Sequence, residues 1–549
     1  MNRDDNKHET DGAVLTAWMP DLLYTGGRFR RDMALVSDGE GRIVDVVDVP
    51  EELFESIGGE AHSMAFPARG IVVATRFVRL RNRALLPGLV NSHSHAFQRV
   101  IRGRTEYASS ARAASDSFWT WREMMYSAAA RLTPEDIYDA SRMAFLEMAL
   151  GGITSVGEFH YLHRTPQGTP YDDPNLLAKE VVRAARDVGL RIALLRVAYA
   201  RAGYNVAPNE RQTRFIESDA DTYLRHVERL HDDITAEQTP SVVSPFDYEI
   251  AAAHGAWVGV APHSVRAVPL EYLRAVCAFA DERGLPVHMH VAEQPAEVAA
   301  CLDEYGRTPV VLLADEGLLS ERFTGVHAVH ITPAEARALA VARACVCACP
   351  TTERNLGDGI VPADLLFREG VALSLGTDSH TQIDLLEDAR ELEYHLRLQR
   401  LARNVLAPVA DANEKTGSTR GNGATNGATN ANHEDTSDAE TQLSSLAARL
   451  FECATVGGAR SIGVPAGEFA TGRPADFFTV NLHDPSIAGA AAEDLLPSIL
   501  FSLARTAIRE VAVGGRLVVE DGAHPSASEI VTRFNALQRR LWHASGDDH

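Results

Sequence analysis

Short apolar runs alternate with amphipathic stretches through the middle of the chain. Eight such runs lie between about residues 86 and 406: LLPGLVNSHSH, GITSVGEFHY, RIALLRVAYA, AWVGVAPHS, LPVHMHVAE, TGVHAVHI, ACVCACPTT and GVALSLGTDS. Stretches such as PEDIYDASRMAFLEMAL lie between them, with apolar residues three and four positions apart, as is typical of helices. Nearly continuous apolar strands that alternate with helices indicate a parallel sheet covered on both faces. Because there are eight, we predict an α/β fold with a closed (β/α)8 barrel over residues 86–406.

Both ends of the chain have a different, β-like pattern. Residues 13–85 and 466–525 contain short apolar runs separated by glycines and charged turns. We therefore predict a small β-sandwich built from both terminal segments. Residues 444–465 are expected to form a helical return to it, and residues 526–549 a C-terminal helix or tail.

Two polar segments are predicted to be disordered. They are residues 1–12 at the N-terminus and residues 407–443, which include the low-complexity stretch DANEKTGSTRGNGATNGATNANHEDTSDAET. Such a composition buries too little apolar surface to offset the entropy lost on ordering.

The charge balance excludes some partners. The 549 residues include 53 Lys and Arg against 75 Asp and Glu, which gives a formal charge of −22. A field of this sign repels phosphate backbones and anionic membranes, so neither nucleic acid nor a membrane is expected as a partner. The N-terminal residues have no apolar core of a signal peptide, and no apolar run approaches the roughly 20 residues of a membrane span. We predict a cytoplasmic protein.

The six cysteines fit a reduced compartment. Three of them, Cys345, Cys347 and Cys349, alternate along one predicted strand. This spacing favours core packing over a second metal site, and six cysteines in so long a chain do not form a disulfide framework.

Candidate metal ligands lie at the ends of three of the runs. His93 and His95 are two residues apart on a strand, so their side chains point to the same face and can bind one ion. The fifth run contributes His290, and the eighth contributes Asp378 near its end. In a barrel these strand ends converge on one mouth. Three imidazoles and a carboxylate, with one position left open, suit catalytic Zn²⁺. We predict one zinc ion per subunit on these four residues, with Fe²⁺ as the alternative.

Neighbouring groups could move protons at such an ion. Glu293 follows His290 by three residues and could reach a water molecule there. For this reason we expect His290 to be the ligand and His288 to be its structural neighbour. The sixth run contains both His327 and His330, and the pattern alone does not choose between them.

Several motifs carry a family resemblance. NSHSHAFQR, HVAEQ and LGTDSH resemble the metal motifs of the amidohydrolase superfamily, and GEFATGRPADFFTV resembles its C-terminal strand signature. GITSVGEFHYLH, APHSVRAV and CPTTERNLGDG are similar to those members that remove ammonia from formimidoyl amino acids. Some members of the superfamily bridge two metals with a carboxylated lysine on the fourth strand. No lysine lies in AWVGVAPHSV, so we expect a site for a single metal ion.

The resemblance implies an activity. It is the hydrolysis of N-formimidoyl-L-glutamate, a small dianionic substrate, to N-formyl-L-glutamate and ammonia in histidine degradation, by a homodimer. Asp378 would accept a proton from water, Glu293 would carry protons to the departing nitrogen, and His327, preferred here over His330, would polarise the attacking oxygen. The alternative is a deaminase of a purine or related heterocycle, which would need stacking aromatic residues in place of an arginine pair. A catalytically silent barrel would not need this complete set of residues.

The resemblance also implies substrate contacts, because a dianion inside an acidic protein needs local cations. The implied residues are Gln98, Arg122, Tyr161, His263 and Arg266. The planar guanidinium of arginine pairs two N–H groups with one carboxylate. The competing interpretations are surface salt bridges for the two arginines and packing at the rim for Tyr161. We expect Trp119 and Trp121 either to line the pocket or to form a buried aromatic pair.

Overall fold

The computed structural model describes most of the chain. The described residues are 15–50, 64–68, 70–74, 76–107, 118–207, 209–236, 255–408 and 446–543. Residues 1–12, which were predicted to be disordered, lie outside them, as do residues 409–443 of the predicted disordered segment 407–443.

The middle of the chain forms a parallel barrel. Within the described residues its eight strands are β8 (Leu89–Ser94), β9 (Ile153–His160), β10 (Arg191–Ala198), β11 (Ala256–Pro262), β12 (Val287–Val291), β13 (Phe323–His327), β14 (Cys345–Ala348) and β15 (Ala372–Leu375). They pair in chain order from β8 to β15, and the last strand lies against the first, where a bridge joins Ser94 and Asp378. The (β/α)8 prediction is confirmed, and its physical basis is that every one of these strands is buried along almost its whole length.

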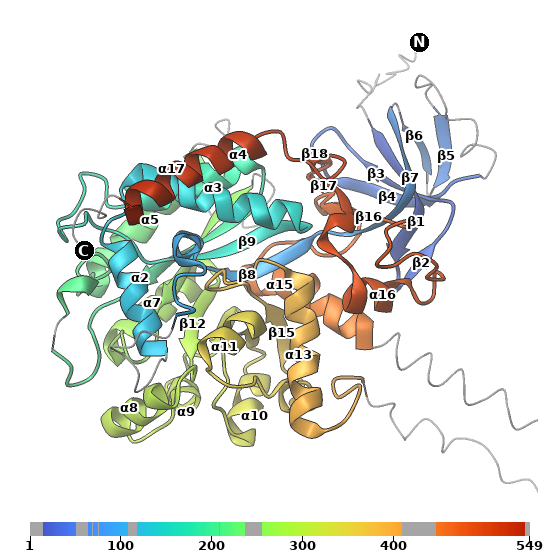
Figure 1. Ribbon diagram of the computed structural model, residues 1–549. Coiled ribbons are helices and arrows are strands. Elements are labelled where there is room, and N and C mark those ends of the chain that lie inside the picture. The colour runs from blue at the N-terminus through green and yellow to red at the C-terminus, as the bar shows by residue number, and fades with distance from the viewer. Residues whose placement is uncertain are drawn as a thin grey trace, which may run out of the picture.

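Helices follow the strands and cover the outside of the barrel (Figure 1). They are α2 (Phe118–Ala129), α3 (Pro134–Leu150), α4 (Leu176–Val188), α5 (Ala220–Ala236), α7 (Leu270–Arg283), α8 (Pro295–Tyr305), α9 (Pro309–Asp315), α10 (Pro333–Val341), α11 (Pro350–Leu356), α12 (Ala363–Glu369) and α13 (Leu385–Arg400), with short 3-10 turns η1 (Ala96–Ile101) and η3 (Glu210–Gln212). Local sequence sets their ends. Thr133 and Asp136 form a capping box at the start of α3, and α4 ends at Gly189 in the left-handed conformation.

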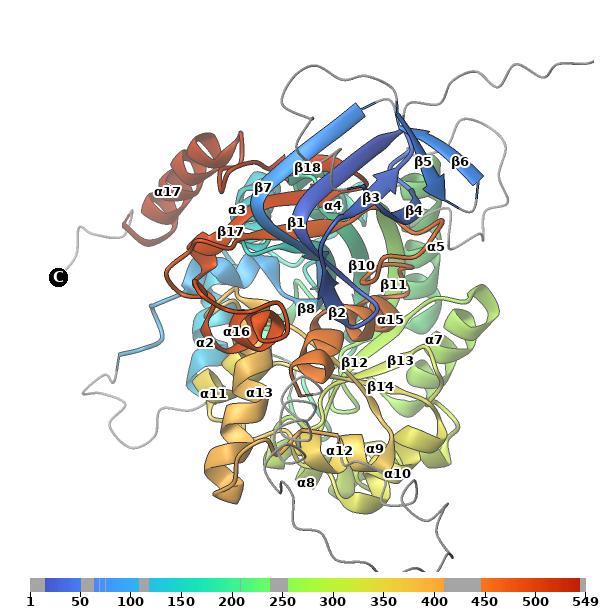
Figure 2. The ribbon, with the colours of Figure 1, turned by 90° about the vertical axis from the view of Figure 1, so that its right-hand side faces the viewer.

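Both ends of the chain build the second domain, as predicted. One sheet has the order β18-β17-β16-β7-β1-β3-β4, with β2 paired to β1, and β5 and β6 form a separate two-stranded sheet. The N-terminal strands are β1 (Thr16–Thr25), β2 (Arg28–Arg30), β3 (Met33–Ser37), β4 (Ile43–Asp48), β5 (Met64–Ala68), β6 (Gly70–Ala74) and β7 (Arg76–Pro87), and the C-terminal ones are β16 (Phe477–Asn481), β17 (Ile508–Val513) and β18 (Arg516–Val519). Figure 2 shows the blue N-terminal and red C-terminal strands side by side. Trp18 and Phe477, from opposite ends of the chain, pack edge to face with ring centroids 5.0 Å apart.

Elements from the C-terminal part also pack against the barrel. They are α15 (Val456–Ile462), α16 (Leu495–Ser502), η5 (Arg505–Ala507) and α17 (Ala527–His543). The carbonyl of Ile462 in α15 accepts a hydrogen bond from Trp257 Nε1 on β11 at 2.8 Å, and α17 contacts α3. Among the described residues, no helix combines the length and apolar character that a membrane span requires.

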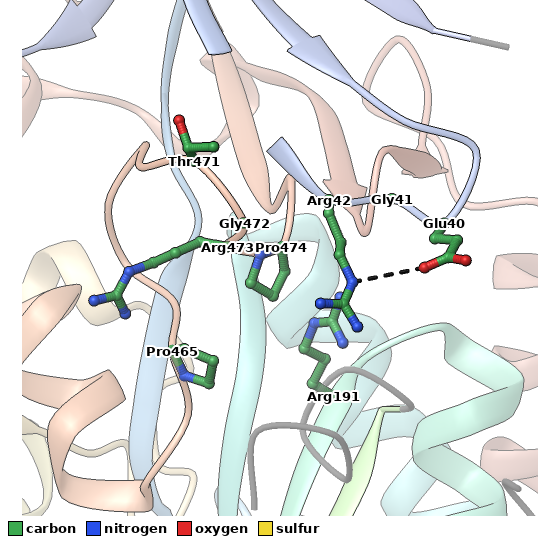
Figure 3. A pocket seen from close by; sticks show the side chains of 9 residues that line it. All are labelled: Glu40, Gly41, Arg42, Arg191, Pro465, Thr471, Gly472, Arg473 and Pro474. Atoms are coloured by element: carbon green, nitrogen blue, oxygen red, sulfur yellow. Dashed lines mark ion pairs between the residues drawn. The ribbon is translucent and has the colours of Figure 1, made fainter. Parts of the chain in front are cut away.

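A depression lies at the junction of the two domains (Figure 3). Arg42, Arg191 and Arg473 line it, and Arg191 begins β10. The guanidinium of Arg191 is buried and bonds Asp476 with an Nε–Oδ2 distance of 2.8 Å, which links the barrel to the sheet domain. The depression therefore lies at the amino ends of the barrel strands, away from their carboxyl ends.

Candidate active site

Three histidines and an aspartate meet at the carboxyl ends of the strands. His93 lies on β8, His95 directly after it, His290 on β12, and Asp378 three residues after β15. Their donor atoms all lie within 4.8 Å of one another, and all four side chains are buried. The two Nε2 atoms of His93 and His95 are 3.2 Å apart, and Asp378 Oδ1 lies 3.2 Å from Nε2 of His95. The sequence-predicted ligand set therefore converges on one point.

The hydrogen bonds of the imidazoles suit a metal ion. Nδ1 of His95 bonds the carbonyl of Phe159 at 3.0 Å, and Nδ1 of His290 bonds the carbonyl of His263 at 3.1 Å. A carbonyl only accepts, so each Nδ1 carries the hydrogen and each Nε2 lone pair faces the cluster. Burial lowers the pKa of His93 to about 3 and that of His290 well below its ordinary value. The imidazoles of His93 and His290 are thus neutral, as ligands must be.

Asp378 completes the cluster as a carboxylate. Burial by itself would raise its pKa, but the adjacent imidazoles of His93 and His95 hold the pKa well below its ordinary value. A negative oxygen beside neutral imidazole nitrogens is the donor set that a borderline divalent cation prefers. The residues present therefore fit a single divalent metal ion.

The backbone around Asp378 is held in an unusual shape. Asp378 has φ = 42°, and His327 on the neighbouring side of the site has φ = 73°. The Asn91 side chain accepts from the Thr377 amide at 3.0 Å and donates to the Thr377 hydroxyl at 2.8 Å. A Cβ at Gly376 would lie 2.7 Å from Cβ of His93, so only glycine lets this loop pass the ligand. Strained positions of this kind persist where the surrounding structure overdetermines them, as at functional sites.

Two further groups face the cluster. His327 Nε2 lies 3.6 Å from Glu293 Oε1 and 3.8 Å from Asp378 Oδ2. Its Nδ1 lies 3.2 Å from Oε1 of Glu353, which also accepts from the Cys349 amide. Burial by itself would lower the pKa of His327, but Glu293 and the bond to Glu353 raise it well above its ordinary value.

Glu293 is poised to exchange a proton. Burial raises the pKa of its carboxyl, and the imidazole of His327 beside it opposes that rise. By contrast, Nε2 of His330 bonds the carbonyl of Asp358 at 2.9 Å, and Nε2 of His288 bonds the carbonyl of Ser461 at 2.8 Å. His327 and His290 thus reach the cluster, while His330 and His288 bond backbone carbonyls instead.

One pocket joins the metal cluster to the predicted substrate contacts. Its lining includes His95, His290, Glu293 and Asp378 together with Gln98, Arg122, Tyr161, His263 and Arg266. Gln98 Nε2 donates to the Tyr161 hydroxyl at 2.8 Å, and the ring centroids of His263 and His290 are 4.9 Å apart. Every residue predicted to contact substrate therefore lies on the wall of this pocket.

Neither pocket arginine is held in a direct ion pair by a residue that the structure describes, although Glu297 and Glu293 act on Arg266 electrostatically. Among the described residues, no carboxylate forms an ion pair with Arg122 or Arg266, although most other arginines have one. The guanidinium of Arg122 stacks on the Trp119 ring, 4.3 Å from its centroid, and Nε of Arg122 is buried without a hydrogen-bond partner among the described residues. The surface salt bridges considered for these arginines are absent from the described part of the chain. Both arginines contribute to the wall of the pocket.

Sequence reasoning missed several lining and supporting residues. Tyr126 and Tyr199 line the pocket, Gln212 bonds both from behind, and Glu353 supports His327. No motif or spacing marked Tyr126 and Gln212, because a helix and a 3-10 turn have no strand periodicity. Tyr199 follows β10 within the predicted run RIALLRVAYA, and its position at a strand end was the available signal. Only the position of Glu353 inside CPTTERNLGDG could have drawn attention to it.

The structure shows where the two tryptophans and the three neighbouring cysteines lie. Trp121 lines the pocket, whereas Trp119 is 38% exposed and stacks against Arg122. Cys345, Cys347 and Cys349 are all buried. The possible ligand atoms of Cys349, His327 and Glu353 also lie within 4.8 Å of one another. However, Oε1 of Glu353 already bonds Nδ1 of His327 and the backbone amide of Cys349.

The fold and the cluster define a class of protein: barrel hydrolases that act with a divalent metal at the carboxyl ends of the strands. The profile of the amidohydrolase family matches residues 84–518. The chain belongs to the amidohydrolase family, whose members hydrolyse bonds such as C–N.

Individual relatives show which members of the family this chain resembles. The chain is 38% identical over 452 residues to a formimidoylglutamate deiminase of Pseudomonas aeruginosa, covering 82% of this chain and 88% of that one. It is 27% identical over 533 residues to a 5-methylthioadenosine/S-adenosylhomocysteine deaminase of Halobacterium salinarum, covering 94% and 97% of the two chains. Among solved structures, an amidohydrolase from Brucella melitensis is similar with a TM-score of 0.75 and 29% identity, covering 96% of this chain and 99% of that one. An adenosine deaminase from Xanthomonas campestris with bound zinc has a TM-score of 0.70 at 21% identity, over 96% and 98% of the chains, and shows the same fold.

Proposed function

We propose that this protein hydrolyses N-formimidoyl-L-glutamate to N-formyl-L-glutamate and ammonia with one bound zinc ion. The observation that carries the proposal is the pair Arg122 and Arg266. Both line the pocket of the metal cluster, and neither forms a direct ion pair with a carboxylate of the described residues. In a protein of formal charge −22, two such cations favour a substrate with two carboxylates. The similarity to a formimidoylglutamate deiminase supports the same substrate.

The metal ligands would be His93, His95, His290 and Asp378. A zinc ion there would supply a Lewis acid that lowers the pKa of water to near neutrality. Zinc is preferred to iron because three neutral imidazoles and one carboxylate suit it.

The chain's own residues move the protons. Asp378 and Glu293 accept protons from the attacking water, and Glu293 passes them to the departing nitrogen. The water oxygen bonds to the amidine carbon, the C–N bond to the terminal nitrogen breaks, and both water protons end on that nitrogen as ammonia leaves. His327, held by Glu353, donates to the oxygen as negative charge develops on it.

The wider context follows from this substrate. The reaction would be a step of histidine degradation in the cytoplasm, carried out by a homodimer with no nucleic-acid or membrane partner. These are predictions, and size-exclusion chromatography with light scattering would test the dimer.

Ammonia release from a substrate panel tests the proposed function. The zinc-loaded protein is expected to turn over formimidoylglutamate far faster than formimidoylaspartate, guanine, adenosine or S-adenosylhomocysteine. Turnover of a purine compound with none of formimidoylglutamate would show instead a heterocycle deaminase.

Replacing Arg266 with glutamine is expected to raise KM for formimidoylglutamate by about 10- to 100-fold and to change kcat much less. The reason is that a hydrogen-bonded ion pair with a carboxylate contributes about 1.5–3 kcal/mol. Steady-state ammonia assays would measure both constants. The matched control is Arg274→Gln, since Arg274 lies on the exposed face of α7. An unchanged KM in Arg266→Gln would refute the assigned contact.

A further inference from the structure

Behind the pocket wall, one buried amide holds two phenols. Gln212, at the end of η3, is 1% exposed. Its Nε2 lies 2.9 Å from the hydroxyl of Tyr126 on α2 and 2.7 Å from the hydroxyl of Tyr199 directly after β10. Both tyrosines line the pocket of the metal cluster, whereas Gln212 does not.

The bonding capacity of these groups fixes their direction. The amide nitrogen has two hydrogens, and it donates one to each phenol oxygen. Each phenol must then turn its own hydrogen elsewhere, and within the described residues neither hydroxyl donates to an acceptor. Burial, with Tyr199 nearby, raises the pKa of Tyr126, so its hydroxyl keeps its hydrogen. Both hydroxyls are therefore donors available to the pocket.

The opposite amide orientation is less favourable. The Gln212 Oε1 atom has no hydrogen-bond partner among the described residues. Turning the amide round would pair Oε1 with both hydroxyls but leave two N–H groups buried without acceptors. A single unpaired carbonyl oxygen is tolerated better than unpaired N–H groups.

The two hydroxyls lie on the same pocket wall as the guanidinium groups of Arg122 and Arg266. Arg122 precedes Tyr126 by one helical turn on α2, and its guanidinium carbon lies 5.5 Å from the centroid of the Tyr126 ring. Burial by itself would lower the pKa of Arg266, but the adjacent Tyr199, which also forms a hydrogen bond with it, helps to raise that pKa. This part of the wall therefore presents two cations and two hydroxyl donors, a combination that selects a carboxylate over an amide or a neutral ring.

We infer that Gln212 is a positioning residue that holds Tyr126 and Tyr199 as hydrogen-bond donors to a substrate carboxylate. In this way Gln212 makes the pocket specific for substrates that bear a carboxylate. The inference rests on the proposed function. Gln212 touches no substrate itself. It acts by keeping the hydroxyl hydrogens turned away from itself.

Gln212→Glu tests this directly in the zinc-loaded full chain. The nearly isosteric carboxylate accepts both hydroxyl hydrogens, so the pocket loses both donors. KM for formimidoylglutamate is expected to rise about 10- to 100-fold, because each lost bond to a charged group costs about a factor of ten or more, while kcat stays within about threefold. Gln399→Glu, the same charge change at an exposed position on α13, is expected to leave both constants unchanged.

A double-mutant cycle separates positioning from simple charge repulsion. In a Tyr126→Phe/Tyr199→Phe background, Gln212→Glu is expected to raise KM less than about threefold further, since no hydroxyls remain to turn. An equal rise in that background, or an unchanged KM in Gln212→Glu alone, would overturn the inference. Metal content and circular dichroism establish that each variant is folded.

Glutarate binding keeps this test independent of turnover. Isothermal titration is expected to show glutarate binding the wild type at least tenfold more tightly than Gln212→Glu, with a smaller difference for its monoamide. If the wild type releases no ammonia from formimidoylglutamate, the proposed function fails, while the glutarate comparison still decides the role of Gln212. Equal glutarate affinities would overturn that role even in an active enzyme.

Discussion

Glu293→Gln is expected to lower kcat for formimidoylglutamate by about 10²- to 10⁴-fold, with metal content unchanged. Glu293 lies 3.6 Å from His327 and lines the pocket beside the metal cluster, but it is not one of the four donors. An amide of the same shape cannot take a proton from water and pass it to the departing nitrogen, and a positioned acid–base group contributes a factor of this size. Stopped-time ammonia assays and elemental analysis of the same sample would measure both effects.

The control for this variant is Glu282→Gln. The Glu282 side chain is 76% exposed near the end of α7 and is expected to tolerate the change without loss of activity. A fully active Glu293→Gln would refute the proton-transfer role. Loss of the metal in that variant would show that Glu293 acts on the cluster itself.

His290→Gln is expected to remove the bound metal and to lower kcat/KM by about 10³-fold or more. The His290 Nε2 lone pair faces the cluster because its Nδ1 hydrogen is held by the carbonyl of His263. Loss of a Lewis acid that contributes several kcal/mol corresponds to a rate loss of this order. Elemental analysis after desalting would give the ions per chain, expected to fall from one to near zero.

The matched control is two residues earlier on the same strand. His288→Gln removes an equally buried imidazole, but one that bonds the carbonyl of Ser461. This variant is expected to keep one metal ion per chain and most of its activity, at some cost in thermal stability. Retention of metal by His290→Gln, or its loss in His288→Gln, would reverse the assignment of the two histidines.

Strand periodicity made the metal cluster predictable. His93 and His95 share a face because side chains alternate along a strand, and a parallel barrel brings the carboxyl ends of distant strands to one mouth. These two rules join His93 to Asp378 across 285 positions without knowledge of the loops. The same reasoning predicted the barrel itself, because each strand is a continuous apolar run.

The pairing of strands from the two ends of the chain could not be predicted from the hydrophobic pattern alone. The sequence showed two β-rich terminal segments, and the structure showed that β16 pairs antiparallel with β7, placing Phe477 opposite Pro87. Alternation along one strand does not specify its partner, because many strands of similar length present the same backbone groups. Side-chain packing across the sheet, such as Trp18 on Phe477, selects the pairing.

By itself, then, the sequence determined the barrel, the ligand set and the absence of a lysine on the fourth strand, since each follows from local spacing and residue type. The tertiary structure alone decided that Tyr126, Tyr199 and Gln212 meet, that Glu353 supports His327, and that Asp378 adopts a positive φ. These features arise where loops and helices, which lack the alternating pattern of the strands, pack against the barrel mouth. Their geometry depends on the whole fold, so no local pattern of residues encodes it.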